Sequence, residues 1–332
     1  MRIAVLGAGS WGTTLAILLS HNHHHVTLWG HRADHTASLT EHRENTVLLP
    51  GVPIPASIDI THDLERALHG AEMIVAAIPA QFLRHTAEKI RAIDFRRVLI
   101  VNVAKGIENE SLMSMSDVLR DVLPDLDPAH IATLSGPSFA EEVAKKVPTA
   151  VVVASSSIET AKLAQKTFMT PYFRVYSSTD IRGVELAGSI KNVIAIGAGI
   201  ADGAGFGDNT KAAIMTRATA ELSRLGSCFG AQQQTFAGLS GIGDLIATCM
   251  SRHSRNRHVG EEIGRGRKLL EVLDEMVMVA EGVASTRSVH DLGKKYHVEL
   301  PIVNEVFQVL FHDKDAIAAT RSLMTRDAKG EL

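Results

Sequence analysis

The chain has 332 residues, of which 45% are hydrophobic and 21% are charged, and its formal net charge is −3. This composition is typical of a folded globular protein and excludes a disordered one, and the length suggests two domains. So small a net charge gives no general attraction to nucleic acid or to anionic lipid, so a site for a negative ligand must be a local cluster of positive groups.

The cysteine content and the first residues indicate a reducing compartment. Only Cys228 and Cys249 are present, which argues against a disulfide framework. The start, residues 1–7, lacks the apolar core and cleavage site of a signal peptide, and no apolar run approaches the ~20 residues of a membrane span. We therefore expect a cytoplasmic protein that does not insert into a membrane.

The first third of the chain alternates apolar strand-like runs with helical stretches. Residues 2–6 form a short apolar run that ends in glycines, and residues 13–20 are apolar at helical spacing. Further strands are predicted at 26–29, 73–78, 98–103, 150–154 and 173–176. Continuous apolar strands separated by helices predict a parallel sheet covered on both faces.

A glycine-rich motif lies between the first strand and the first helix. Gly7 permits a tight turn, Gly9 lets the backbone approach a pyrophosphate, and Gly12 allows the helix to pack closely on the strand. The free N–H groups of the helix start and the positive end of the helix dipole then bind the diphosphate. The motif predicts a Rossmann domain that binds a nicotinamide dinucleotide.

The end of the second strand bears on which dinucleotide is bound. An NAD site usually has an acidic residue ~20 residues past the glycines, but here the sequence continues with His31 and Arg32. A basic pair suits a 2′-phosphate, which favours NADP(H) and leaves NAD(H) possible. The alternative, in which Arg32 is a solvated residue that stacks on adenine, stays open.

The histidine-rich stretch 23–25 could be a metal-binding tract or a solvated link between a helix and a strand. No cysteine, aspartate or glutamate joins it, so we favour the link and assign no metal site.

After about residue 180 the pattern becomes helical. Long helices are predicted at 180–202 and 209–225, and further helical segments begin near 242, 260, 284 and 303. The predicted fold is therefore an α/β Rossmann amino-terminal domain, residues 1–178, followed by an all-α carboxyl-terminal domain, residues 179–332, that carries substrate and catalytic groups.

Lys191 is the one charged residue of the apolar stretch 186–201. A helix that is apolar on all sides is a buried helix, so this lysine must reach solvent, find a partner, or lie at a cavity with a depressed pKa. A desolvated lysine can donate and accept protons. The neighbouring Asn192 and the nearby glycines favour a functional site.

A basic cluster at 251–258 contains Arg252, Arg255 and Arg257 together with hydroxyl and amide donors. Arginine binds oxyanions through paired hydrogen bonds, so the cluster suits a phosphate. A solvated basic turn is an equal alternative from these residues alone, whereas a nucleic-acid patch is disfavoured because no aromatic platform accompanies it.

Two further segments, 103–106 and 134–140, lie where a Rossmann fold places substrate, beyond the carboxyl ends of strands. Together with the motifs above they resemble the bacterial-type NAD(P)-dependent glycerol-3-phosphate dehydrogenase family. The matching pieces run in family order at 7–13, 102–106, 135–140, 188–192, 241–245, 254–256 and 279–282. Thr14 stands where the family would have alanine.

The resemblance implies a reversible NAD(P)H-dependent reduction of dihydroxyacetone phosphate to sn-glycerol 3-phosphate that supplies glycerophospholipid synthesis, carried out by a homodimer. Lys191 would be the catalytic acid and base, with Lys105 and Asp244 orienting the substrate. Besides the three motif glycines, the implied dinucleotide contacts are Ser10, Trp11, His31, Arg32, Lys105, Ala140, Arg255, Val279 and Glu281. The implied substrate contacts are Lys105, Gly136, Ser138, Lys191, Asp244, Ser254, Arg255 and Asn256.

Two other functions are compatible with parts of this pattern. A dehydrogenase of another small phosphorylated or carboxylated substrate would share the Rossmann domain, the helical domain and the lysine. A dinucleotide sensor would bind the cofactor and turn over no substrate, and it would have no use for a buried lysine beside a phosphate site.

Overall fold

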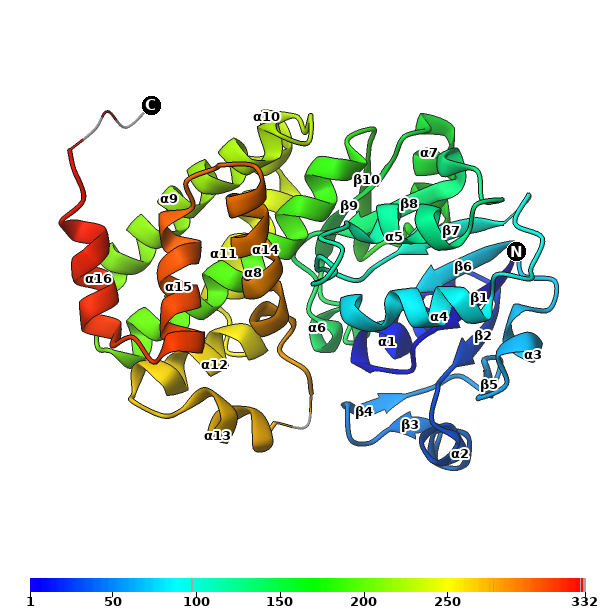
Figure 1. Ribbon diagram of the computed structural model, residues 1–332. Helices are drawn as coiled ribbons and strands as arrows, with labels where there is room; N and C mark the ends of the chain where they lie inside the picture. The colour runs from blue at the N-terminus through cyan, green and yellow to red at the C-terminus, as the bar shows by residue number, and fades with distance from the viewer. Residues whose placement is uncertain (97, 277, 329, 331–332) are drawn as a thin grey trace. The chain divides into compact units, whose positions relative to one another are not determined.

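The computed structural model describes residues 1–96, 98–276, 278–328 and 330. The chain divides into two compact units, one of residues 1–106 and 113–185 and the other of residues 107–112 and 186–332. The described strands lie in the first unit, and the second is built of helices (Figure 1).

The described residues of the first unit form an eight-stranded sheet of order β10-β9-β8-β7-β6-β1-β2-β5. Strands β8 and β9 pair antiparallel, and the other neighbours pair in parallel. From β5 to β8 this is the strand order typical of a Rossmann fold. The strands are β1 (Arg2–Leu6), β2 (His25–Trp29), β5 (Asp59–Thr61), β6 (Met73–Ala76), β7 (Leu99–Asn102), β8 (Ile131–Ser135), β9 (Thr149–Ser155) and β10 (Phe173–Ser178).

Helices cover both faces of this sheet. Side chains of a strand alternate between its faces, and apolar side chains on both faces are buried under helices. In β1, Ile3 and Val5 belong to one hydrophobic cluster, whereas Ala4 and Leu6 belong to another. Beside the sheet lie the short hairpin β3 (Glu44–Asn45) and β4 (Leu49–Pro53) and the helices α1 (Ser10–His21), α2 (Ala33–His42), α3 (Leu64–Leu68), α4 (Leu83–Lys89), α5 (Met115–Val122), α6 (Ala140–Ala144) and α7 (Ile158–Phe168).

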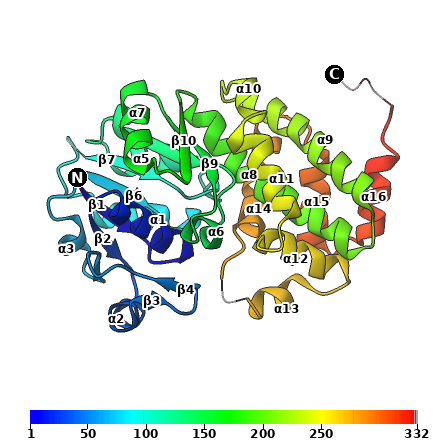
Figure 2. The same cartoon turned by 180° about the vertical axis from the view of Figure 1, so that it is seen from behind.

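The second unit is organised around α8 (Ile181–Gly203), whose residues from 186 onward belong to it. The two opposite views place α8 among α9, α11, α12, α14 and α15 (Figure 1, Figure 2). The other helices are α9 (Asp208–Ser227), α10 (Gln233–Phe236), α11 (Asp244–Met250), α12 (Arg255–Gly264), α13 (Leu269–Asp274), α14 (Glu281–Lys295), α15 (Pro301–His312) and α16 (Ala316–Met324).

The α/β Rossmann part followed by a helical part agrees with the fold class predicted from the sequence. The six predicted strands correspond to β1, β2, β6, β7, β9 and β10, and the two long predicted helices to α8 and α9. The expectation of a parallel sheet was wrong for the pair β8 and β9, which is antiparallel, and the strand β8 was not predicted. The division into functional domains at 178/179 stays a prediction. The boundary between the two compact units lies inside α8, between residues 185 and 186.

Among the described residues, α8 has the length and composition of a membrane span, with a mean hydropathy of 1.4. The expectation that no apolar run approaches such a length was therefore wrong. The whole of that window is buried within the protein, which is typical of a core helix.

A buried carboxyl group on α9 accepts hydrogen bonds from backbone N–H groups in the first turn of α15. Glu221 Oε1 accepts a hydrogen bond of 2.7 Å from the backbone N–H of Ile302, in the first turn of α15. Glu221 is 2% exposed, and burial raises the pKa of this carboxyl to about 7, although the backbone N–H groups favour its ionised form.

We predict that Glu221 makes stability depend on pH. Because its folded pKa exceeds the unfolded value of 4.5, its contribution is full below pH 4.5 and is lost as pH rises towards 7. Glu221→Gln keeps an oxygen acceptor and cannot titrate. The variant should therefore gain unfolding free energy relative to the parent between pH 4.5 and 7, by up to about 3 kcal/mol. Denaturant unfolding at several pH values measures this, and parallel curves would contradict it.

Candidate functional site

In the glycine-rich turn between β1 and α1, two glycines have no room for a side chain and the third does. Gly7 has φ +115°, and a Cβ on Gly12 would lie 1.8 Å from the Gly7 carbonyl oxygen. A Cβ on Gly9 would meet no atom within 4 Å, and Gly9 caps α1 without a side-chain hydrogen bond. The start of α1, at Ser10 and Trp11, therefore faces open space and fits the pyrophosphate of a dinucleotide.

The basic pair predicted to select the cofactor lies after β2. His31 and Arg32 are exposed, and Arg32 is already engaged, since its Nε donates a hydrogen bond of 3.2 Å to Asp34 Oδ1. The guanidinium lowers the pKa of the Asp34 carboxyl to about 2. A 2′-phosphate would therefore compete with Asp34 for Arg32, and because both side chains are exposed, this pair is weak enough to exchange.

Four predicted site residues gather after β7 and β8. Lys105 Nζ donates a hydrogen bond of 3.0 Å to the carbonyl oxygen of Gly136, and Ser138 Oγ donates one of 3.1 Å to the same oxygen. Ala140 begins α6, and its carbonyl oxygen accepts a hydrogen bond of 3.2 Å from Thr14 Oγ1. Thr14, the departure from the family pattern, thus ties α1 to α6.

In the second unit, Lys191 forms an ion pair with Asp244 and a hydrogen bond with Thr248. Its Nζ donates hydrogen bonds of 2.8 Å to Asp244 Oδ1 and 2.7 Å to Thr248 Oγ1. The Lys191 and Asp244 side chains are 9% and 3% exposed. The ammonium group is therefore neutralised and its direction is fixed.

Asp244 is placed by a turn that requires glycine, since a Cβ on Gly241 would lie 2.0 Å from the Phe236 carbonyl oxygen.

Sequence reasoning missed Thr248, although a signal existed: it follows Asp244 by four residues on α11, which puts both side chains on one face. Thr248 Oγ1 donates a hydrogen bond of 2.6 Å to the Asp244 carbonyl oxygen, so its lone pairs face Lys191.

The residues predicted to hold phosphate lie at the start of α12. Ser254 is the N-cap, and its Oγ accepts a hydrogen bond of 3.2 Å from the backbone N–H of Arg257. Arg255 is exposed and donates from Nη1 to the carbonyl oxygen of Val279 at 2.7 Å. The start of α12 therefore combines a helix N-terminus with an exposed guanidinium.

Asn256 joins this cluster to the helix of Lys191. Its Nδ2 donates to Asn192 Oδ1 at 3.0 Å, and its Oδ1 accepts from the backbone N–H of Gly282 at 2.9 Å. Gly282 lies in the first turn of α14, directly after Glu281. The hydrogen bonds thus connect α8, α12 and α14. They use one N–H of the Asn256 side-chain amide and its carbonyl oxygen.

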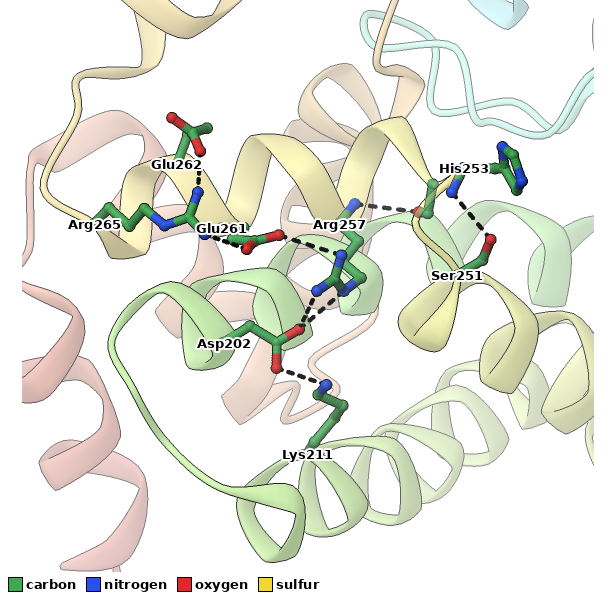
Figure 3. Close-up of polar contacts among 9 residues, drawn as sticks. Asp202, Lys211, Ser251, His253, Arg257, Glu261, Glu262 and Arg265 are labelled. Atoms are coloured by element: carbon green, nitrogen blue, oxygen red, sulfur yellow. Dashed lines mark hydrogen bonds and ion pairs between the residues drawn. The ribbon is translucent and has the colours of Figure 1, made fainter.

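The three arginines of the basic cluster do not act alike. Arg252 and Arg255 are exposed, but Arg257 forms ion pairs with Asp202 at 2.8 Å and with Glu261 at 3.2 Å (Figure 3). The guanidinium of Arg257 is therefore engaged by carboxylates, and phosphate binding by this cluster stays a prediction.

Both parts of the chain match models of one family. Residues 2–161 match the amino-terminal model of NAD-dependent glycerol-3-phosphate dehydrogenase, and residues 180–321 match the carboxyl-terminal model. The glycerol-3-phosphate dehydrogenase (NAD(P)+) of Chlorobium phaeobacteroides (strain BS1) is 54% identical over 332 residues, covering 100% of this chain and 99% of that protein. The enzyme of that name from Geobacter sp. (strain M21) is 48% identical over 99% of this chain and 98% of its own.

The chain belongs to the NAD-dependent glycerol-3-phosphate dehydrogenase family. The crystal structure of glycerol-3-phosphate dehydrogenase from Coxiella burnetii, 35% identical, matches with a TM-score of 0.94 over 98% of this chain and 99% of that one. D-mandelate dehydrogenase with NADH and anilino(oxo)acetate, 15% identical with a TM-score of 0.63 over 98% of this chain and 100% of that chain, shares the fold alone. Membership in the glycerol-3-phosphate dehydrogenase family confirms the predicted resemblance, while the roles of individual residues stay predictions.

We predict that two alanine substitutions in the glycine-rich turn separate cofactor binding from folding. Gly12→Ala forces a Cβ against Gly7, so the melting temperature should fall. Gly9→Ala has room in the protein and should leave the melting temperature nearly unchanged, but its methyl group occupies the space of the pyrophosphate and should weaken NADPH binding. Thermal unfolding and fluorescence titration measure the two effects. Tight NADPH binding by Gly9→Ala would show that the pyrophosphate binds elsewhere.

Proposed function

We propose that the chain catalyses the reversible NAD(P)H-dependent reduction of dihydroxyacetone phosphate to sn-glycerol 3-phosphate. The observation that carries this function is Lys191, buried and held by Asp244 and Thr248, on a helix that Asn192 joins to the start of α12. A proton donor is thereby connected to a phosphate receptor. The names of the relatives, which cover almost the whole chain, support the same reaction and its NAD(P) cofactor.

Lys191 would protonate the substrate oxygen. When bound, a dinucleotide would supply the hydride for C2 of the ketone, and Lys191 Nζ would donate the proton that the substrate oxygen takes up. Hydrogen bonds to Asp244 and Thr248 orient the ammonium group. Because the donor is oriented before the substrate arrives, the reaction avoids the entropy of aligning it.

Ser254, Arg255 and Asn256 would hold the phosphate at the start of α12. The helix N-terminus favours an anion, and the exposed Arg255 can bind phosphate oxygens through two hydrogen bonds. Phosphate held here places the ketone carbon at a set distance from its anchor, so binding energy far from the reacting bond contributes to the rate. In the first unit, Lys105, Gly136 and Ser138 would supply the remaining substrate contacts.

The cellular setting follows the same proposal. The family resemblance supports a cytoplasmic homodimer whose product enters glycerophospholipid synthesis. A dehydrogenase of another small acid is not favoured, because proteins named glycerol-3-phosphate dehydrogenase match this chain from end to end. An assay of NADPH oxidation with dihydroxyacetone phosphate, compared with 2-keto acids, tests the function. Turnover of no substrate would favour the dinucleotide sensor.

We predict that Lys191→Met lowers kcat ~10²–10⁴-fold, because a positioned general acid is lost. NADPH binding, measured by fluorescence titration, should change little. The substitution leaves Asp244 buried without its cation, which is destabilising, so Lys191→Met/Asp244→Asn serves as a second variant that carries no buried charge at this pair. The double variant should fold and remain equally slow. If it regained nearly full turnover, Lys191 would not be the acid, and Lys105 would be the next candidate.

We predict that residues 32 and 34 set the ratio of NADPH to NADH use. Arg32→Ala should weaken NADPH binding roughly ten- to a hundred-fold and NADH binding far less, since a charge-assisted hydrogen bond to the 2′-phosphate is lost. Asp34→Asn frees Arg32 from its carboxylate and should strengthen NADPH binding. Dissociation constants for both cofactors measure this. Equal weakening of NADPH and NADH by Arg32→Ala would indicate stacking on adenine instead.

A further inference from the structure

Helices α8 and α12 touch through their backbones at four glycines. A Cβ on Gly199 would lie 2.0 Å from the Arg257 carbonyl oxygen, and one on Gly203 would lie 2.0 Å from that of Glu261. From the other side, a Cβ on Gly260 or Gly264 would lie 2.0 or 2.4 Å from carbonyl oxygens of α8. Each helix thus presents two glycines four residues apart, so even a methyl group would push the helices apart.

An ion-pair cluster lies beside this contact (Figure 3). Arg257 on α12 donates from Nε to Asp202 Oδ2 on α8 at 2.9 Å. Lys211 on α9 pairs with Asp202 Oδ1 at 2.6 Å. The side chains of Asp202, Arg257 and Lys211 are 14%, 16% and 12% exposed, so solvent screens these pairs less than surface pairs.

Arg257 connects this cluster to the phosphate-binding residues. Its backbone N–H donates to the N-cap oxygen of Ser254, while its side chain is anchored on α8. On α8, Asp202 follows Lys191 by eleven residues, which is three turns and puts both on the same side of the helix. The anchor and the proton donor thus belong to one rigid element.

We propose that Arg257 is a positioning residue for the reaction, which assumes the function proposed above. Its ion pair with Asp202 holds α12 against α8 at one register, so that Ser254, Arg255 and Asn256 keep a fixed distance from Lys191. The glycines fix how close the helices come. The ion pair adds a charged anchor at Asp202 to the hydrogen bond between Asn192 and Asn256, so that α12 is held to α8 at two points.

The test uses the full-length protein and compares dihydroxyacetone phosphate with dihydroxyacetone, which lacks the phosphate. Arg257→Met should lower kcat/KM for dihydroxyacetone phosphate by on the order of 10²-fold, the effect of displacing a substrate anchor by about 1 Å. The kcat/KM for dihydroxyacetone should fall much less, because that substrate does not use α12. Arg257→Lys, which keeps the charge, should recover part of the loss.

Asp202→Asn distinguishes positioning from direct binding of phosphate by Arg257. If Arg257 is a positioning residue, this variant should lose kcat/KM for dihydroxyacetone phosphate as Arg257→Met does, and the double variant should be no worse than either single one. If Arg257 binds phosphate itself, removal of a competing carboxylate should keep or strengthen phosphate affinity, which overturns the proposal. Lys211→Met is the matched control, because it removes the other cation of Asp202 and leaves α12 anchored. Its kinetics should match those of the parent.

Three further outcomes overturn the proposal. Equal losses on both ketones, together with a lower melting temperature and weaker NADPH binding, would mean that Arg257 only stabilises the fold. Unchanged kinetics in Arg257→Met, with a parent that reduces dihydroxyacetone phosphate, would reject the positioning role and leave the proposed function intact. A parent that does not reduce dihydroxyacetone phosphate rejects both.

Discussion

The second unit depends on the positive charge of Lys191 inside an apolar helix. A buried ammonium group is costly unless a carboxylate neutralises it and hydrogen bonds satisfy its protons. Asp244 and Thr248 meet both needs, and they do so only because the glycine at 241 permits the turn that begins α11 beside α8. Helix α11 is therefore held to α8 by these hydrogen bonds as well as by the apolar packing of Leu245 and Cys249.

The same helix also has to serve a second neighbour. Lys191 is directed to α11, and the next residue, Asn192, is directed to Asn256 on α12. Consecutive residues of a helix point about 100° apart, so one turn of α8 can hold a proton donor on one side and orient the phosphate-binding helix on the other. Such an arrangement tolerates little sliding of α12, which accounts for the backbone contacts of four glycines behind it.

The sequence predicted what short-range patterns encode. The strand, glycine-rich turn and helix at the start are adjacent in the chain, and Lys191 was found because it is the only charge in a sixteen-residue apolar stretch. The partners that decide what each group does are distant: Asp244 lies 53 residues from Lys191, and Arg257 lies 55 residues from Asp202. Pairing over such separations depends on tertiary packing, so Arg257 was grouped by its neighbours in sequence with ligands of phosphate. Strand β8 was missed because a threonine and a serine interrupt the apolar run of Ile131–Ser135.

The two helix N-termini that would bind anions use opposite means. At α1 the cap is Gly9, and the pyrophosphate would approach bare backbone, so this site depends on the absence of side chains. At α12 the cap is Ser254, already hydrogen-bonded, and the exposed Arg255 adds charge, so this site depends on where side chains are held. A protein with a net charge of −3 has no general field to attract anions, and both sites must be local. At α1, a glycine would therefore contact the ligand. At α12, the glycines lie in the contact with α8 and position the helix that carries the ligand-binding side chains.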